Sequence, residues 1–598
     1  MKLSDYVFQF VAQLGVKHVF MVPGGGAMHL NDSVGHCQGV EFVCNLHEQA
    51  SAIAAEAYAK VTEHLGVALV TTGPGGTNAV TGVAGAWLDS TPCLFLSGQV
   101  KRSDLIGNTG VRQMGVQEID IVSIVRPITK YAVTIMQPTR IRYHLEKAIF
   151  IAKSGRPGPV WIDIPLDVQA AQIDPETLEE FDPRKIAIVT APDNLETLVV
   201  RTIELLNAAE RPILLIGNGV RLAGAKEDCL HLIHRLNLPV LLTWPAQDFL
   251  PDTHELLVGR PGPVAPRGAN FALQNSDWLL TIGARLDLLL TGYAHDRFAR
   301  AAKKIMVDID PSEINKIKAL IDVPVCADAK SFIQGLLRQS SQIVPQDRYG
   351  WRARCRDWKT RYPVVQPEYR EQKLVSTYVL AEVLSDELTG DDIIVAGSSG
   401  AGIEIFLLAF RAKAGQRIFL TTALGAMGFG PPASIGACLA GGRKRTVCVD
   451  GDGGLQLNIQ EFETIARLKL PIKLFVLNNQ GYSSIRTSQM RYFGRLTGAD
   501  ASSGTTLPLL EKVAAAYGLP TARIADQTDL KRQVRDVLES PGPVVCEVMV
   551  CPDEPRAPSL SSVQRPDGSM VSKPLEDLWP FLERQEFLSN MLIPPLEE

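Results

Sequence analysis

Short apolar segments recur along the whole chain and alternate with stretches of helical periodicity. Segments of three to seven residues rich in Val, Ile and Leu are typical of strands that are buried on both faces of a sheet. We expect eleven such strands, at residues 67–72, 93–97, 160–164, 213–216, 240–243, 278–282, 305–309, 393–396, 447–449, 472–477 and 544–550. Because helical patterns separate the segments, the connections are expected to be crossovers between parallel strands. The pattern predicts an α/β protein.

Eleven strands are too many for one ordinary sheet. Two segments without strand patterns divide the chain, an acidic, proline-containing stretch around 173–184 and an arginine- and proline-rich linker at 340–373. We therefore predict three doubly wound parallel-sheet domains, at residues 1–175, 188–340 and 374–552. Residues 553–598, with a helical patch at 575–588, are predicted to form a C-terminal tail that serves as a lid or an interface arm.

The composition excludes several classes of protein. With 598 residues, 46% hydrophobic and 21% charged, the chain is too apolar to be disordered and too long for one core. A formal charge of −5 without a block of Lys or Arg speaks against nucleic acid binding. No apolar run reaches the ~18–20 residues of a membrane span, and the N-terminus lacks a signal-peptide pattern, so we predict a cytoplasmic protein. The cysteines and histidines show no zinc-binding spacing, and we interpret the cysteines as reduced thiols.

Two polar motifs follow predicted strands in the third domain. The strand at 447–449 leads into Gly-Asp-Gly-Gly at 451–454 and a helical pattern, where glycines allow a sharp turn and the helix N-terminus favours phosphate. The strand at 472–477 leads into Asn-Asn-Gln-Gly-Tyr at 478–482. If these strands are adjacent and parallel, Asp452 and the side-chain oxygen of Asn479 meet at one edge. Such oxygens suit Mg²⁺ that carries a diphosphate, whereas the alternative interpretation is two unrelated turns.

This pair of motifs resembles the signature of thiamine-diphosphate (ThDP) enzymes. The resemblance implies that Mg²⁺ is held by Asp452, Asn479 and the backbone carbonyl of Gly481. It also implies that ThDP lies against further residues of the same two motifs, Gly451, Gly453, Gly454 and Tyr482.

A second part of the resemblance lies in the first domain. ThDP enzymes activate the cofactor with a glutamic acid that is hydrogen-bonded to N1′ of its aminopyrimidine, just before a helix of small residues. Residues 45–59 fit this pattern, with Glu48 as the activator. The alternative for Glu48 is an acidic residue that complements a helix N-terminus. Glu56, later in the helix, is interpreted as structural.

Other segments resemble the loops that contact ThDP in this family. In the segment 422–432, the resemblance implies that the Gly425 carbonyl faces the 4′-amino group and that Met427 bends the cofactor. The alternative for Met427 is a core-filling side chain. The remaining ThDP-binding candidates are Gly25, Gly75, Asn78, Gly397 and Ser398.

Over nearly all of residues 1–555 the chain is most similar to the acetolactate (acetohydroxyacid) synthases. In that group the middle domain binds FAD, and the resemblance implies FAD contacts at Gly217, Gly219, Arg285, Asp308 and Asp328. The alternative is that these are surface loops without a ligand, because a lone Gly-x-Gly after a strand is weak support for a nucleotide site. A flavin would be structural, since the carboligation moves no net electrons.

The sequence departs from the acetolactate synthases at three positions near the reaction centre. A phenylalanine becomes Val116, an active-site lysine becomes Leu166, and the tryptophan that selects the second 2-oxo acid becomes Ser488. Losing a cation and two aromatic rings of ~150–250 Å² each favours an acceptor that is larger and less charged than pyruvate. Gln117 is retained as a catalytic candidate. His29 is a candidate proton shuttle or acceptor contact, with a structural histidine as the alternative.

We therefore expect a ThDP- and Mg²⁺-dependent enzyme that decarboxylates a 2-oxo acid, such as pyruvate, and transfers the two-carbon acyl-anion equivalent to a larger ketone or aldehyde. This chemistry is similar to that of the flavin-dependent carboligase type of the yersiniose pathway. The alternatives are a true acetolactate synthase, a C–C bond lyase or hydrolase of the same family, and a non-catalytic nucleotide-binding subunit. The resemblance also implies a homodimer or homotetramer, with the active site between the first domain of one subunit and the third domain of another.

Overall fold

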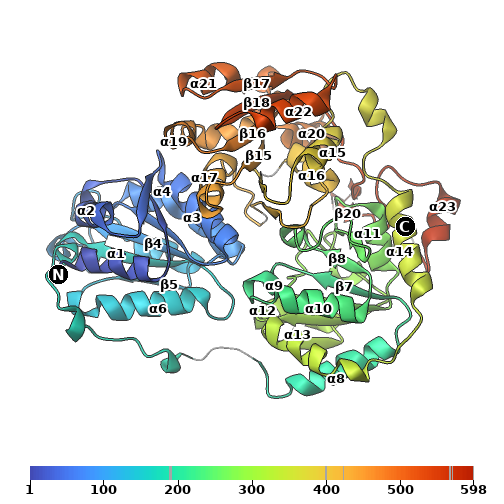
Figure 1. The fold of residues 1–598 in the computed structure, drawn as a ribbon, viewed down its shortest axis with the longest axis horizontal. Helices are drawn as coiled ribbons and strands as arrows, with labels where there is room; N and C mark the ends of the chain where they lie inside the picture. Colours follow the sequence, from blue (N-terminus) through green and yellow to red (C-terminus); the bar gives the residue numbers. More distant parts are fainter. Residues whose placement is uncertain (187–190, 398–399, 422, 565–566, 569, 597–598) are drawn as a thin grey trace.

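Three parallel sheets of six strands each form the framework of the protein (Figure 1). The computed structural model describes residues 1–186, 191–397, 400–421, 423–564, 567–568 and 570–596. Helices flank each sheet, and the sheets follow one another along the chain. The predicted α/β class with three parallel-sheet domains is confirmed, while the predicted domain boundaries stay predictions.

The N-terminal sheet has the strand order β2-β1-β3-β4-β6-β5. Its central strands β3 and β4 are buried along their whole length, as their continuous apolar sequences predict. The strands are β1 (His18–Met21), β2 (Glu41–Cys44), β3 (Gly66–Val70), β4 (Cys93–Gln99), β5 (Tyr131–Thr134) and β6 (Val160–Pro165). The helices are α1 (Leu3–Gln13), α2 (Met28–His36), α3 (Glu48–Thr62), α4 (Pro74–Leu88), α5 (Ile121–Val125), α6 (Ile141–Lys153) and α7 (Leu166–Gln169).

The middle sheet has the order β12-β11-β10-β7-β8-β9, which is the strand order of dinucleotide-binding sheets. Its strands are β7 (Pro212–Ile216), β8 (Val240–Leu242), β9 (Leu257–Gly259), β10 (Trp278–Ile282), β11 (Lys303–Asp308) and β12 (Val323–Cys326). Its helices are α8 (Leu195–Asn207), α9 (Gly219–Leu222), α10 (Lys226–Leu236), α11 (Arg267–Gln274), α12 (Pro311–Asn315), α13 (Ala329–Arg338) and α14 (Tyr349–Arg361).

The C-terminal sheet has the order β14-β13-β15-β16-β18-β17, which repeats the order of the N-terminal sheet when each is numbered from its own first strand. Its strands are β13 (Ile393–Ala396), β14 (Arg417–Phe419), β15 (Thr446–Gly451), β16 (Ile472–Asn478), β17 (Thr521–Ile524) and β18 (Val544–Met549). Its helices are α15 (Thr377–Glu387), α16 (Ala401–Ala409), α17 (Gly430–Ala440), α18 (Asp452–Leu455), α19 (Glu461–Arg467), α20 (Ser483–Phe493), α21 (Leu510–Ala516) and α22 (Leu530–Glu539).

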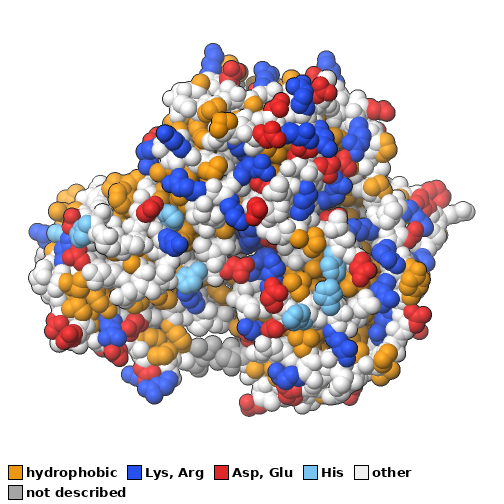
Figure 2. All heavy atoms as spheres, in the orientation of Figure 1, with side chains coloured by type: hydrophobic (Ala, Val, Ile, Leu, Met, Phe, Trp, Pro, Cys, Tyr) orange, Lys and Arg blue, Asp and Glu red, His pale blue; other side chains and the backbone are white. Residues whose placement is uncertain are grey.

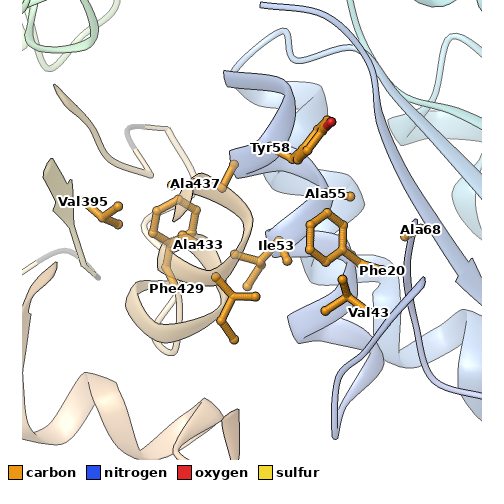
Figure 3. Packing of buried hydrophobic residues seen from close by; sticks show 14 of the residues in the cluster. Phe20, Val43, Ile53, Ala55, Tyr58, Ala68, Val395, Phe429, Ala433 and Ala437 are labelled. Carbon is orange, nitrogen blue, oxygen red and sulfur yellow. The ribbon is translucent and has the colours of Figure 1, made fainter. Parts of the chain in front are cut away.

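The N-terminal and C-terminal domains share one continuous apolar core through α3 and α17 (Figure 3). Ile53 on α3 and Ala433 on α17 belong to this core. A Cβ atom added to Gly436 would lie 2.0 Å from the backbone oxygen of Ala54, so the two helix backbones are in direct contact. This packing fixes the orientation of α3, whose first residue is Glu48.

The segment predicted as a linker at 340–373 contains α14, so the linker prediction is wrong for residues 349–361. Trp351 and Trp358 on this helix are buried, and Trp351 Nε1 donates to the backbone oxygen of Pro212 at 3.0 Å. The remaining surface of α14 is strongly charged, which hides the helical periodicity in the sequence.

The first residues of the C-terminal tail bond to the C-terminal domain, where Tyr378 donates to the backbone oxygen of Pro555 at 2.8 Å, and the rest of the tail lies on the middle domain. It contains a hairpin of β19 (Ser562–Gln564) and β20 (Met570–Ser572) and the helix α23 (Arg584–Asn590), which occupies only the end of the helical patch predicted at 575–588 and runs past it. Arg267 donates to the backbone oxygen of Leu578 at 2.9 Å, and Trp358 Nε1 donates to Asn590 Oδ1 at 2.8 Å. Within one chain, the tail is therefore a strap across the middle domain.

In each sheet there is a pair of adjacent central strands whose connections leave in opposite directions, so that the loops after these two strands diverge. These positions lie between β1 and β3, between β7 and β10, and between β13 and β15. Ligands of open α/β sheets bind at such positions, outside the carboxyl ends of the strands. The three switch points are therefore the places where binding sites are expected.

The surface carries charges of both signs. On the face shown in Figure 2, acidic and basic side chains are interspersed over the molecule. This mixture agrees with the near balance of 60 Lys and Arg against 65 Asp and Glu in the chain. Among the described residues, none of the helices combines the length and hydropathy that a membrane-spanning segment requires.

Candidate active site

The two polar motifs of the C-terminal domain meet at the carboxyl edge of its sheet. Strands β15 and β16 pair in parallel, with Gly451 opposite Leu477, so Asp452 and Asn479 follow neighbouring strand ends. The backbone N–H of Gly481 donates to Asp452 Oδ2 at 3.2 Å and joins the two motifs directly. The structure therefore brings together the residues that the sequence predicted to meet.

The oxygen atoms at this edge suit a divalent cation. Asn479 Oδ1 is buried and has no hydrogen-bond partner among the described residues, while the amide nitrogen of the same side chain donates to Ser483 Oγ at 3.2 Å. Burial raises the pKa of the Asp452 carboxyl to about 6, although backbone N–H groups of Gly453 and Gly481 lower it. Mg²⁺ would satisfy both the carboxylate and the unpartnered amide oxygen. In the described part of the chain, no group of three His, Cys, Asp or Glu side chains is arranged to hold a metal ion.

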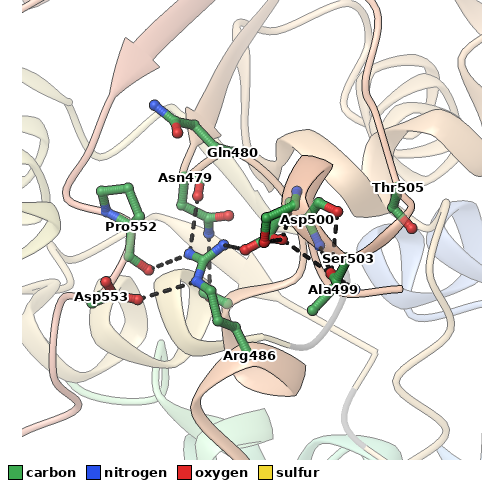
Figure 4. A network of polar contacts seen from close by, with 12 residues as sticks. Asn479, Gln480, Arg486, Ala499, Asp500, Ser503, Thr505, Pro552 and Asp553 are labelled. Atoms are coloured by element: carbon green, nitrogen blue, oxygen red, sulfur yellow. Dashed lines mark hydrogen bonds and ion pairs between the residues drawn. The ribbon is translucent and has the colours of Figure 1, made fainter. Parts of the chain in front are cut away.

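A buried arginine fixes the loop that carries Asn479 (Figure 4). Arg486 on α20 donates to the backbone oxygen of Asn479 at 3.1 Å and to that of Pro552 at 2.6 Å. It also pairs with Asp553 at 3.1 Å. Sequence reasoning gave Arg486 no role, because nothing in its neighbourhood indicates that it folds back onto the preceding loop.

At two of the predicted cofactor-binding glycines, close packing within the protein explains why no larger residue fits. A Cβ atom at Gly397 would lie 2.2 Å from the carboxyl carbon of Asp450, and one at Gly453 would lie 2.6 Å from the ring of Tyr482. Gly451 instead faces open space. Of these three glycines, only Gly451 therefore leaves room beside it for a bound group.

The loop that is predicted to grip the aminopyrimidine projects outward. Gly425 has a φ of +64°, in the left-handed region that favours glycine. Met427 is 39% exposed, so the alternative that it fills the core is wrong. Gly454 is buried in the first turn of α18. Ser398 lies outside the described residues.

Glu48 begins α3, directly after the loop that follows β2. Its carboxyl is nearly buried, and Asn78 Nδ2 on α4 donates to Glu48 Oε2 at 3.0 Å. A Cβ atom added to Gly75 would lie 3.7 Å from Glu48 Oε1, so α4 begins beside this carboxyl. The N-terminus of α3 is capped by the ring of His47, which accepts from the backbone N–H of Gln49 at 3.1 Å. Glu48 is therefore not the capping residue, but as the acidic residue of the first turn it also complements the helix N-terminus, so both interpretations of Glu48 stay predictions.

Three loops at the edge of the N-terminal sheet touch one another. A Cβ atom at Gly24 would lie 2.5 Å from Thr71, which joins the loop after β1 to the loop after β3. A Cβ atom at Gly73 would lie 2.2 Å from the backbone oxygen of Gln117, which joins the loop after β3 to the segment after β4. Candidate residues predicted from separate motifs thus share one edge of the sheet.

The side chains on these loops differ in exposure. Gln117 has a φ of +62°, a conformation that is unfavourable for a residue with a side chain, and it is exposed. Gly25 is exposed with open space beside it. His29 is half-buried in the first turn of α2. Backbone strain at an exposed Gln117 is typical of a functional position.

Glu48 and Asp452 belong to different domains. Within one chain, no hydrogen bond or ion pair between described residues joins the two side chains directly, although Asn45 Nδ2 reaches Glu461 Oε2 across the domain boundary at 2.8 Å. Within one chain, the two carboxyl groups are thus connected only indirectly, through the packing and the hydrogen bonds between the two domains.

A cavity of about 550 Å³ lies at the switch point of the middle sheet. Gly219, Arg285, Asp308 and Asp328 are among its wall residues, as predicted. Gly217 lies next to this wall, where a Cβ atom would lie 2.1 Å from the backbone oxygen of Gly283, and its predicted cofactor contact stays a prediction. The predicted FAD contacts and the alternative that these residues hold no ligand both stay predictions.

The cavity wall includes cations from the other two domains. Lys60 and Arg156 come from the N-terminal domain and Arg417 from the C-terminal domain. Lys60 also pairs with Glu56 at 2.7 Å, which agrees with a structural role for Glu56. Burial raises the pKa of Asp308 to about 6, although the nearby guanidinium of Arg156 lowers it. Sequence reasoning missed these cations because they lie far from the middle domain in the sequence.

Comparisons with known proteins agree with this geometry. Three family models match: the thiamine pyrophosphate enzyme N-terminal TPP binding domain at residues 1–124, the central domain at 199–336 and the C-terminal TPP binding domain at 402–548. Thiamine pyrophosphate (TPP) is ThDP. Acetolactate synthase 1, chloroplastic, of Nicotiana tabacum is 32% identical over 580 residues, which cover 94% of this chain and 83% of that protein.

Two microbial relatives are similar to the same degree. The acetolactate synthase of Arthrospira platensis is 32% identical over 560 residues, 92% of this chain and 94% of that protein. The probable acetolactate synthase large subunit of Methanococcus aeolicus is 32% identical over 555 residues, 90% of each chain. The chain belongs to the thiamine pyrophosphate enzyme family, and within it to the acetolactate synthase-like enzymes, which confirms the predicted resemblance.

Proposed function

We propose that this ThDP-dependent enzyme decarboxylates a 2-oxo acid, pyruvate in the simplest case, and joins the two-carbon unit to a second carbonyl compound. The supporting observation is that the Asp452 carboxylate and the side-chain oxygen of Asn479, which accepts no hydrogen bond from the described residues, follow neighbouring strand ends at the carboxyl edge of the C-terminal sheet. These atoms and the Gly481 carbonyl are the proposed ligands of Mg²⁺, which would hold the ThDP diphosphate. When bound, ThDP supplies the electron sink for loss of CO₂.

Glu48 is the proposed activator. Its carboxyl would hold a proton at N1′ of the aminopyrimidine, and the hydrogen bond from Asn78 to Oε2 supports this role because it orients the carboxyl. Gln117 would act at the reaction centre, and His29 would contact the acceptor. The remaining proposed contacts to ThDP come from Gly25, Gly75, Gly397, Ser398, Gly425, Met427, Gly451, Gly453, Gly454 and Tyr482.

Pyruvate is the acceptor that the relatives favour, because the curated proteins quoted above are named acetolactate synthases. This enzyme would then make acetolactate from two pyruvates. A second candidate, a larger ketone or aldehyde acceptor, is favoured by the side chains at the three departing positions. Val116 is 84% exposed, Leu166 is half-buried, and the hydroxyl of Ser488 donates to the Ser484 backbone oxygen at 2.9 Å. None of these three side chains supplies the cation or aromatic wall that suits a small charged acceptor.

The cavity of the middle domain is the proposed FAD site. Its volume of about 550 Å³ is within the ordinary range for cofactor sites. Asp308 and Asp328 can accept hydrogen bonds from ribose hydroxyl groups, and the guanidinium of Arg285 can pair with a diphosphate. The yellow colour and visible absorbance of the purified protein test this assignment.

The active site is proposed to lie between two copies of the chain. Support comes from the large apolar side chains that remain exposed on the site loops and on α20, namely Leu46, Val116, Met427, Ile485 and Phe493. A second subunit would cover such surfaces, and a symmetric dimer would form two equal sites.

One experiment separates the acceptors. The enzyme is incubated with Mg²⁺, ThDP and pyruvate, with or without a bulky ketone, and the products are identified by NMR. Acetolactate formed from pyruvate alone supports the first candidate, and pyruvate consumption that requires the ketone supports the second. Absence of pyruvate consumption under both conditions contradicts the proposed function.

A further inference from the structure

Gln99 connects two of the loops that meet at the edge of the N-terminal sheet. It is the last residue of β4, and only 2% of it is exposed. Its amide nitrogen Nε2 donates to the backbone oxygen of Ile119 at 3.0 Å, on the segment that carries Gln117. Its Oε1 accepts from Thr72 Oγ1 at 2.7 Å, on the loop that leads to Gly75 and α4.

The side chain of Gln99 has all of its hydrogen-bonding capacity used. Besides the two loop contacts, Nε2 donates to Asp163 Oδ2 at 3.2 Å and Oε1 accepts from the backbone N–H of Val100 at 3.0 Å. A primary amide has two donors and accepts two bonds, so no other side chain of this size satisfies all four partners. Buried polar networks of this kind fix one arrangement of the groups they join.

Asp163 anchors Gln99 from inside the sheet. It lies on β6, next to β4, and it is 1% exposed. Ser97 Oγ donates to its Oδ1 at 2.6 Å, and Thr134 Oγ1 donates to its Oδ2 at 3.0 Å. The Asp163 carboxyl group is therefore held by side chains from β4 and β5. The Gln99 side chain cannot rotate without breaking its hydrogen bond to this carboxyl group.

The loop that Gln99 holds needs an external support. Gln117 has a φ of +62°. Its backbone oxygen lies so close to Gly73 that a Cβ atom added to Gly73 would be 2.2 Å from it. The carboxylate of Glu118 organises the preceding segment, because it accepts from the backbone N–H groups of Met114 and Gly115 at 3.0 and 2.9 Å. Glu118 thus holds the residues before Gln117, and Gln99 holds the residues after it through the backbone oxygen of Ile119.

The C-terminal sheet contains a similar arrangement beneath its own site loop. Asn478 is the last residue of β16, and its Nδ2 donates to Glu547 Oε1 on β18 at 2.8 Å. Its Oδ1 accepts from the backbone N–H of Gln480 at 3.1 Å, in the loop that carries Asn479. Both sheets therefore place an amide at the end of the fourth strand, hold it with a carboxylate from the sixth strand, and use it to fix the loop that follows.

We propose that the Gln99 bridge, formed by Thr72, Gln99, Ile119 and Asp163, is a positioning device that sets the place of Gln117 at the reaction centre. This inference rests on the proposed role of Gln117. Gln99 itself touches no reacting group, and its effect on turnover passes through the backbone of 115–119. Misplacement of a reacting group by about 1 Å can cost up to about 100-fold in rate, so loss of the bridge should affect catalysis more than folding.

Two substitutions test the bridge. Gln99→Glu keeps the shape but loses both N–H donors and places a second carboxyl group beside Asp163, which also faces the charge of Asp120. Thr72→Val removes only one hydroxyl donor. Thr202→Val is the matched control, because it removes a buried hydroxyl that bonds Leu198 in the middle domain, far from the loops in the sequence.

We expect Gln99→Glu to lower kcat for pyruvate consumption by about tenfold at pH 8 and to leave KM within about threefold, because the loop orients rather than binds. At pH 6 the defect should shrink, because the introduced carboxyl group is then partly protonated and its O–H can donate to the backbone oxygen of Ile119. Thr72→Val should lower kcat by about threefold. Hydrogen exchange of residues 115–119 should rise in both variants and stay unchanged in Thr202→Val.

Unchanged exchange at 115–119 and unchanged kcat in Thr72→Val and in folded Gln99→Glu would overturn the inference. Equal loss in Thr202→Val would overturn it as well, because the effect would then come from general destabilisation. The Gln117→Ala variant distinguishes the role of Gln117 in turnover from the role of Gln99 in holding the loop. Full turnover of that variant contradicts the role of Gln117 and the influence of the bridge on turnover, while the exchange data still decide whether Gln99 holds the loop.

Discussion

The N-terminal and C-terminal sheets have the same strand order, yet their edges carry different chemistry. At the N-terminal edge, the acid Glu48 is oriented by an amide donor from Asn78. At the C-terminal edge, Asp452 and Asn479 present oxygen atoms, and the buried side-chain oxygen of Asn479 has no hydrogen-bond partner in the described part of the chain. The common framework sets where the two edges lie, and the residues at the strand ends and helix starts give each edge its own set of polar groups.

The largest expected effect comes from replacing the acid at the N-terminal edge, Glu48, while the proposed metal ligands at the C-terminal edge stay unchanged. We expect Glu48→Gln to lower pyruvate turnover by about 100-fold or more, because proton transfer by a positioned acid contributes about 10²–10⁴-fold. Binding of ThDP with Mg²⁺, measured by tryptophan fluorescence, should change little. Glu41→Gln, an exposed change on β2, is the control. Wild-type turnover in Glu48→Gln would remove the proposed chemistry from the N-terminal edge.

The reverse change disables the metal site and leaves the acid intact. Asp452→Asn should weaken Mg²⁺-dependent ThDP binding by at least about tenfold, since even indirect disturbance of metal ligands costs that much. Isothermal titration at fixed Mg²⁺ measures this effect, with Asp193→Asn as an exposed control. Equal affinities of Asp452→Asn and wild type would contradict the assignment of Asp452 as a ligand.

The carboxyl groups on the sixth strand of the N-terminal and C-terminal sheets, Asp163 on β6 and Glu547 on β18, are expected to differ in how they make stability depend on pH. Glu547 on β18 lies 3.4 Å from Arg523, whereas the hydrogen-bond partners of Asp163 on β6 are uncharged. Burial raises the pKa of Asp163 to about 7, although hydrogen bonds from Ser97, Gln99 and Thr134 lower it. Because the folded protein then binds more protons than the unfolded chain, this carboxyl makes stability fall as pH rises from about 4 to 7.

We expect the free energy of unfolding of the wild type to drop by about 2 kcal/mol more between pH 5 and pH 7.5 than that of Asp163→Asn, which lacks the titrating group. Urea unfolding at the two pH values measures the difference, and Asp193→Asn should behave as the wild type does. The same pH slope in Asp163→Asn and wild type would show that Asp163 is ionised throughout this range.

The smallest expected effect concerns the orientation of Glu48. Asn78→Ala removes the hydrogen bond to Glu48 Oε2 and should lower kcat by about three- to tenfold, the ordinary value of one hydrogen bond. Asn78→Asp replaces the donor with an acceptor and should lower kcat further, because two carboxyl groups would then compete for one proton. Steady-state kinetics at saturating ThDP decides between these outcomes, and equal rates in all three proteins would exclude an orienting role.

The interior of the fold was predictable from the sequence, and its edges were not. All eleven predicted strands occur, and they form the centres of the sheets. The missed strands are β1, the six edge strands β2, β5, β9, β12, β14 and β17, and the hairpin strands β19 and β20. Most of these edge strands are only partly buried, as in β5, where every residue is half-buried, and β17, where exposure varies from residue to residue. Such strands lack the continuous apolar run that identified the others.

The site shows the same division. The juxtaposition of Asp452 and Asn479 was predictable because both follow apolar strands at the correct spacing. The wall of the cavity in the middle domain was only partly predictable, since Lys60 and Arg417 reach it from other domains. Contacts such as that of Gln99 with Ile119 depend on where loops cross, and no local pattern encodes that crossing.

The central claim is that Glu48 of one subunit serves the metal site of another. Two impaired proteins, Glu48→Gln and Asp452→Asn, can be mixed under conditions that exchange subunits, and pyruvate turnover can be measured over time at a ThDP concentration that leaves Asp452→Asn without cofactor. A shared site predicts recovery to about a quarter of the wild-type rate, because half of the dimers are mixed and one of the two sites in each is intact. Mixtures that stay inactive after exchange has been verified by mass spectrometry would contradict the account.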